Sequence, residues 1–113
     1  MHLGCSEAEK QNAQMVSFNI EFIFKATPLG TKTDNLDDTI CYFKITNEIQ
    51  SLCESKRFNL VEHLAYEAYQ KIIKFLGQNN HGITSLKVTI HKLAPPVPGV
   101  HGGVKFTYTE NIQ

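Results

Sequence analysis

Lys92 places an amine on the face of a predicted strand that is otherwise apolar. Lys92 closes the stretch LKVTIHK and has the same parity as Val88 and Ile90, so a strand here would carry all three side chains on one face. An amine in apolar surroundings can serve as a base, because burial favours its neutral form. Alternatively, the strand ends at residue 91 and Lys92 reaches solvent, or its stem lies along apolar surface.

A carboxylate also occurs among apolar positions. Glu62 lies in FNLVEHLA, one helical turn from Phe58 and Ala65. A carboxylate at this position could accept paired hydrogen bonds from a planar ligand edge that carries adjacent N–H groups. It could instead complete a capping box, because Asn59 precedes it by three residues and is a good helix N-cap. The spacing leaves both interpretations open.

Strands that would hold these groups are indicated by two-residue alternation of apolar side chains. This period occurs over residues 16–24, 86–93 and 103–110, and it predicts strands with one buried face. The stretch 25–39 is rich in Pro, Gly, Asp, Asn and Thr, which predicts a connecting loop.

Helices are predicted between the first two strands. Apolar positions recur near every 3.6 residues over 39–54, with Asp38 or Thr39 available as the N-cap. A second helix is predicted from the Asn59 cap to a stop at Gly77. The expected fold is α+β, with two consecutive antiparallel helices packed on one face of an antiparallel sheet.

Composition limits the classes of protein that fit. A chain of 113 residues with 42% hydrophobic residues has room for a single domain, residues 1–113. Eleven basic residues balance eleven acidic ones without clustering, so no nucleic-acid partner is expected. The three cysteines have no CxxC spacing, which argues against a disulfide framework and a metal site. No membrane span or signal peptide is evident, so we expect a cytoplasmic protein.

A family resemblance rests on three stretches of the sequence. DNLDDTICY, FNLVEHLA and VTIHKLAPPVPGVHGGV, in this order and at these distances, resemble bacterial dihydroneopterin aldolases over roughly residues 3–110. The resemblance implies cleavage of 7,8-dihydroneopterin, a pterin, to 6-hydroxymethyl-7,8-dihydropterin and glycolaldehyde in folate biosynthesis. It implies no metal, Schiff base or other cofactor. It also implies the tunnelling fold, in which a homo-oligomer, tetramer or octamer, joins its sheets into a barrel with active sites between subunits.

The resemblance assigns roles to the polar residues singled out above. Glu62 corresponds to the glutamate that anchors the 2-amino and ring N–H edge of the pterin, and Lys92 to the general acid and base. Tyr42, at the end of DNLDDTICY, corresponds to a tyrosine that a neighbouring subunit contributes to proton transfer. From its residue type alone, Tyr42 would be a core aromatic at a helix start.

Further pocket residues follow from the same resemblance. Glu9 corresponds to a glutamate five residues before a glutamine, here Gln14, although Glu7 lies close enough to take its place. The remaining residues would contribute backbone groups to the substrate-binding pocket, and they are Thr39, Ile40, Cys41 and Val61.

The chain departs from the family at its start. The family has a complete first strand before the glycine that matches Gly4, whereas this sequence enters with MHLG, so we expect a truncated first strand. Such a loss would expose a sheet edge. Two alternative functions stay open. One is epimerisation of dihydroneopterin or its triphosphate, by a related enzyme that shares the fold, the pterin anchor and the lysine. The other is a non-catalytic pterin-binding scaffold subunit, which the short start would favour.

Overall fold

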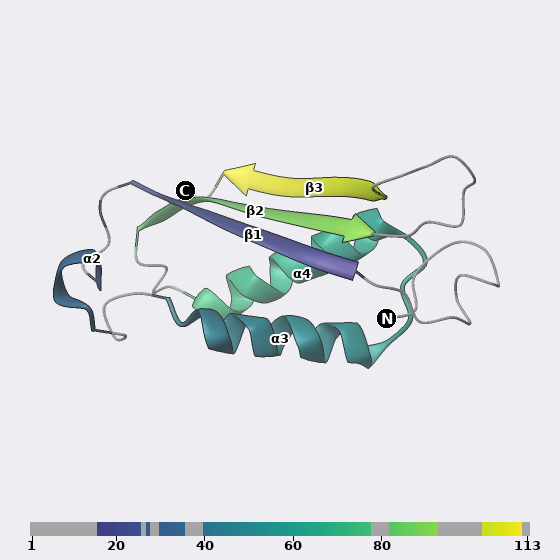
Figure 1. The fold of residues 1–113 in the computed structure, drawn as a ribbon, viewed down its shortest axis with the longest axis horizontal. Helices are drawn as coiled ribbons and strands as arrows, with labels where there is room; N and C mark the ends of the chain where they lie inside the picture. Colours follow the sequence, from purple (N-terminus) through teal and green to yellow (C-terminus); the bar gives the residue numbers. More distant parts are fainter. Residues whose placement is uncertain are drawn as a thin grey trace.

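The computed structural model describes most of the chain as one sheet with helices on one side (Figure 1). The described residues are 16–25, 27, 30–35, 40–77, 82–92 and 103–111. The predicted first strand, at the very start of the chain, lies outside these residues.

The described elements run strand, helices, strand, strand. They are β1 (Val16–Phe24), α2 (Gly30–Thr33), α3 (Tyr42–Ser55), α4 (Val61–Leu76), β2 (Ile83–Lys92) and β3 (Val104–Asn111). The sheet has the order β1-β2-β3, and both pairs are antiparallel. Figure 1 shows α3 and α4 on the same face of this sheet. The predicted α+β fold is therefore confirmed.

The buried face of the sheet follows from the two-residue period of its strands. In β2, Leu86, Val88 and Ile90 are fully buried. Ile90 pairs with Phe18 of β1 and Phe106 of β3, so one apolar row crosses all three strands. Such rows give the helices a continuous surface to cover.

Helix α4 covers this surface directly. It packs against β2 and β3, and α3 packs against α4. Residues at spacings of three and four along α4 are fully buried, as a helix with one apolar stripe requires. They are Leu64, Ala65, Ala68 and Ile72. Tyr69 is also buried. Its hydroxyl donates a hydrogen bond to the Glu110 carbonyl oxygen at 3.1 Å, which satisfies the polar group in the core.

Two local predictions differ from the structure. The segment predicted as a loop contains the single helical turn α2. Helix α3 begins at Tyr42, not at residue 39, and its N-cap is Cys41 in an extended conformation. The physical reason is that Ile40 is buried in the core, and an extended entry carries it there before the helix starts. The proposed caps Asp38 and Thr39 lie outside the described residues.

Candidate functional site

Lys92 is the last residue of β2 and lies on its buried face. The strand runs through Lys92, which pairs with Val16 and Val104, and only 8% of the residue is exposed. The interpretation that the strand ends at residue 91 and leaves Lys92 in solvent is therefore wrong. Lys92 is the one charged residue that is buried among the residues that the structure describes.

Glu62 lies in the first turn of α4, but not as a capping-box residue. The N-cap is Leu60, whose carbonyl accepts the N–H of Leu64 at 3.1 Å, and the helix begins at Val61. Glu62 is thus the second helical residue, and the predicted cap at Asn59 is one residue too early. The backbone is still extended at Leu60 and turns into the helix only after it, which places the N-cap one residue later than predicted. The Leu60 side chain makes no capping hydrogen bond. Glu62 is exposed, and the positive end of the helix dipole favours its charge.

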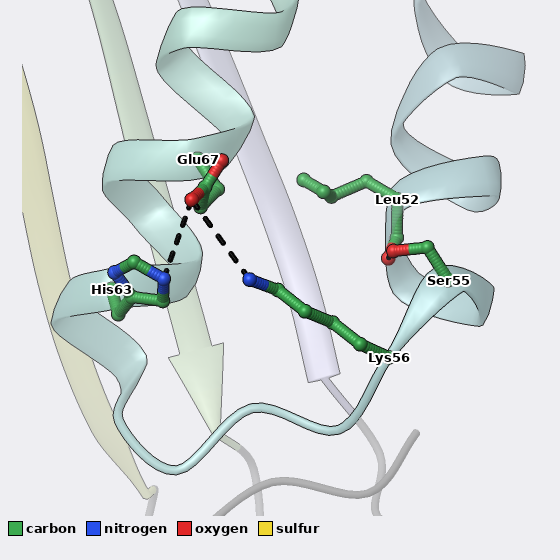
Figure 2. A network of polar contacts seen from close by, with 5 residues as sticks. All are labelled: Leu52, Ser55, Lys56, His63 and Glu67. Atoms are coloured by element: carbon green, nitrogen blue, oxygen red, sulfur yellow. Dashed lines mark hydrogen bonds and ion pairs between the residues drawn. The ribbon is translucent and has the colours of Figure 1, made fainter.

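The segment that leads into α4 is tied to the helix by a small polar network (Figure 2). Glu67 lies 3.3 Å from Nε2 of His63 and 4.0 Å from Nζ of Lys56. The Lys56 ammonium also lies 5.1 Å from the ring centroid of Phe58, which is buried. Each surface contact is worth little alone. Together with the burial of Phe58, they hold the entry to the first turn of α4.

The first turn of α4 and the end of β2 lie at the same end of the sheet. Tyr69 donates to the carbonyl of Glu110, and Tyr66, one turn earlier, packs its ring against that of Tyr108, with centroids 5.6 Å apart. Toward its N-terminus α4 therefore runs toward the start of β3, which pairs with Lys92. Figure 1 shows the first turn of α4 at the end of the sheet where β2 ends, and these two elements carry Glu62 and Lys92.

Tyr42 lies at the opposite end of the sheet. Its ring packs against Phe22, with centroids 6.1 Å apart, whereas Lys92 pairs with Val16 at the other end of β1. Phe22 and Val16 are separated by about 20 Å at about 3.3 Å per strand residue. Tyr42 is 58% exposed, so the interpretation of it as a core aromatic is wrong.

The expected site residues thus form two groups within one chain. Val61 and Glu62 lie with Lys92 at one end, and Ile40 and Cys41 lie with the first residue of α3 at the other. The Ile40 side chain is buried in the core, so only its backbone could serve a ligand. Glu9 and Thr39, expected in the same pocket, lie outside the described residues.

Tyr108 and Cys53 are two further reactive groups whose pKa values are raised by their surroundings. The Tyr108 hydroxyl donates to Oε1 of Glu110 at 2.6 Å, and this hydrogen bond raises the pKa of Tyr108 to about 12. Burial raises the pKa of the Cys53 thiol, which disfavours the nucleophilic thiolate. The Tyr108 hydrogen bond is local, because Glu110 lies two residues along the same strand, whereas the burial of Cys53 depends on packing between distant segments.

The described part of the chain contains neither a cluster of metal-ligating side chains nor a helix that could span a membrane. No group of three or more His, Cys, Asp or Glu residues in this part is arranged to hold a metal ion. No helix in it is both long enough and apolar enough to cross a membrane.

Comparison with known proteins gives a consistent family. A family model described as FolB, dihydroneopterin aldolase, matches residues 1–109. Dihydroneopterin aldolase from Staphylococcus epidermidis is 33% identical over 101 residues, which are 89% of this chain and 79% of that protein. "Probable dihydroneopterin aldolase" from Chlamydia pneumoniae is 29% identical over 112 residues, covering 99% of this chain and 81% of the relative.

Two further matches bear on the alternative epimerase function and on the fold. Dihydroneopterin triphosphate 2'-epimerase from Escherichia coli is 28% identical over 91 residues, 80% of this chain and 71% of that protein. The crystal structure of Escherichia coli dihydroneopterin aldolase in complex with neopterin matches with a TM-score of 0.78 and 21% identity, covering 96% of this chain and 88% of that one. The structural match supports the fold described above.

Proposed function

This chain belongs to the dihydroneopterin aldolase family, lyases of folate biosynthesis, and from that membership we propose how its residues divide the reaction. The substrate is 7,8-dihydroneopterin, and the products are 6-hydroxymethyl-7,8-dihydropterin and glycolaldehyde. Glu62 binds the pterin, Lys92 transfers protons, and Tyr42 of a neighbouring subunit assists the transfer.

The proposed chemistry needs a base and an acid but no external electron sink. A proton leaves the side-chain hydroxyl, the adjacent carbon–carbon bond breaks, and glycolaldehyde departs. The electron pair passes into the conjugated C=N unit of the dihydropterin, which becomes an enamine, and the carbon left behind is then protonated. The substrate therefore supplies the sink that a Schiff base or metal supplies elsewhere. Lys92 can serve both steps, because it accepts one proton and returns one.

The observation that carries the proposal is the placement of Lys92 and Glu62. A buried amine and an exposed carboxylate lie at the same end of the sheet, from two elements that are distant in sequence. A carboxylate with two acceptor oxygens suits the paired N–H groups of a pterin edge. The amine, at the end of an apolar row, would then face the reactive side chain of the substrate.

The direct test is incubation of the purified chain with 7,8-dihydroneopterin. We expect glycolaldehyde and 6-hydroxymethyl-7,8-dihydropterin to appear in equal amounts, measured by chromatography with derivatisation of the aldehyde. Pterin binding without either product would favour a non-catalytic binding subunit and would contradict the proposed lyase chemistry.

Epimerisation is the second candidate function, because the chain also matches an epimerase. An epimerase would invert the side-chain stereocentre and release no glycolaldehyde. Following the substrate and its epimer on a chiral column in the same incubation separates the two activities. Triphosphate dependence is tested by repeating the incubation with dihydroneopterin triphosphate.

The separation of Tyr42 from Lys92 supports a homo-oligomer with shared sites. A span of about 20 Å is too long for a tyrosine and a lysine to act on one small substrate, since proton transfer needs contact at about 3 Å. The first turn of α3 exposes both Tyr42 and Phe43, a surface that a second copy could cover. One subunit would then supply Lys92 and Glu62, and its neighbour Tyr42.

Shared sites predict that two inactive variants complement each other. Lys92→Met and Tyr42→Phe are each expected to lose most activity, because each removes one proton-transfer group. After co-refolding in equal amounts, about a quarter of the sites combine an intact lysine with an intact tyrosine, given random assembly. We expect about a quarter of wild-type activity to return, measured as glycolaldehyde release.

The control is co-refolding of each variant with itself, which should restore nothing. Recovery near zero in the mixed sample, with oligomers verified by size-exclusion chromatography, would contradict sites shared between subunits.

A further inference from the structure

Gly103 lies immediately before β3, next to the backbone carbonyl group of Lys92. Its φ is 80°, in the left-handed region that glycine adopts without steric cost. The following residue, Val104, pairs with Lys92 in the β2–β3 ladder. A Cβ added to Gly103 would overlap the carbonyl oxygen of Lys92 and would lie 2.9 Å from Nε2 of His91. The backbone before β3 thus closes onto Lys92 with no room for a side chain.

This contact distinguishes Gly103 from the other positive-φ glycines of the described chain. Gly82 has a φ of 79°, and Gly77 has a φ of 58°. A Cβ added to either of them would meet nothing within 4 Å. Gly82 therefore shares the backbone conformation of Gly103 but lacks its contact, which makes it a matched control.

We propose that Gly103 is a positioning residue for Lys92, an inference that rests on the proposed role of Lys92 in proton transfer. Lys92 is the last residue of β2, and its pairing with Val104 places its carbonyl beside Gly103. The close approach of Gly103 limits where that carbonyl can lie and, through the shared Cα, where the side chain starts. A reactive group displaced by about 1 Å can lose about a hundredfold in rate.

The test compares Gly103→Ala with Gly82→Ala in the full chain. We expect Gly103→Ala to lower kcat about 10- to 100-fold while the Kd for neopterin changes less than about threefold. Gly82→Ala introduces similar backbone strain and should keep kcat within about threefold of the wild type. Both kcat and Kd are measured on samples whose folding is checked by circular dichroism.

A second readout follows Lys92 itself. Acetic anhydride labelling, quantified by peptide mass spectrometry, reports how accessible the Lys92 amine is. We expect the labelling rate of Lys92 to change at least about threefold in Gly103→Ala and to stay unchanged in Gly82→Ala. A purely structural role for Gly103 would lower stability without this selective change at Lys92.

The outcomes separate this proposal from the one on which it rests. If Lys92→Met keeps wild-type kcat, the proposed role of Lys92 fails. If Lys92→Met is inactive while Gly103→Ala matches Gly82→Ala in kcat and labelling, the proposal for Gly103 alone is overturned. If Gly103→Ala does not fold while Gly82→Ala does, Gly103 serves the fold itself and the positioning proposal is overturned.

Discussion

Replacing Lys92 with methionine is expected to lower kcat by about 10² to 10⁴-fold, the range typical of a lost general acid–base group. Methionine keeps a long apolar stem in the row formed by Val16 and Val104, so the fold should persist. The Kd for neopterin should change little, because the proposed anchor of the pterin is Glu62. Stopped-time assays of glycolaldehyde release and fluorescence titration with neopterin give the two constants separately.

Lys87 provides the matched control on the same strand. It lies at the opposite parity of β2, paired with Glu21 and Thr109, on the face away from the helices. Lys87→Met removes the same charge from the same strand and should leave kcat within about threefold of the wild type. Equal losses in Lys87→Met and Lys92→Met would assign the effect to the sheet as a whole and would exclude Lys92 from the chemistry.

Replacing Glu62 with glutamine is expected to weaken pterin binding. The glutamine amide keeps one acceptor oxygen but replaces the other with an NH2 group. This NH2 donor would face an N–H donor of the ligand, so one hydrogen bond is lost. An unsatisfied hydrogen-bonding group costs about 1–3 kcal/mol, which is about 5- to 150-fold in Kd. Because the loss falls on binding, kcat at saturating substrate should fall much less than kcat/KM.

Glu67→Gln is the control for charge on the same helix. It removes the contacts with Lys56 and His63 shown in Figure 2, which are partly exposed and contribute little to stability. Titration with neopterin should give the wild-type Kd for Glu67→Gln. A Glu62→Gln protein that binds neopterin as tightly as Glu67→Gln would show that Glu62 is not the pterin anchor.

Much of the fold was predictable because strand and helix periods are local. The alternation over 16–24 predicts β1 with its correct ends, and Gly77 ends α4 as expected, with its N–H bonded to the Ile73 carbonyl. Helix starts were less predictable. The cap residues Cys41 and Leu60 have no side-chain oxygen to signal a cap, and tertiary burial of the neighbouring residues Ile40 and Phe58 determines where each helix begins.

The chemistry of the site could also be anticipated in part. The parity of Lys92 with Val88 and Ile90 placed its amine on the apolar face, and the structure confirms that placement. The sequence left two interpretations of Glu62, and the position of the true N-cap removes the capping box. Gly103 gave no recognisable signal, because glycine before a strand usually marks only a turn.

The sequence by itself determined which faces the strands and helices present, since the direction of a side chain in a regular element depends only on local backbone geometry. Only the tertiary structure decided which of those side chains meet. The antiparallel register of β1 and β2 separates Tyr42 from Lys92, and the packing of α4 brings Glu62 toward the end of β2. Contacts of this kind depend on register and packing between segments far apart in the chain, which no local pattern specifies.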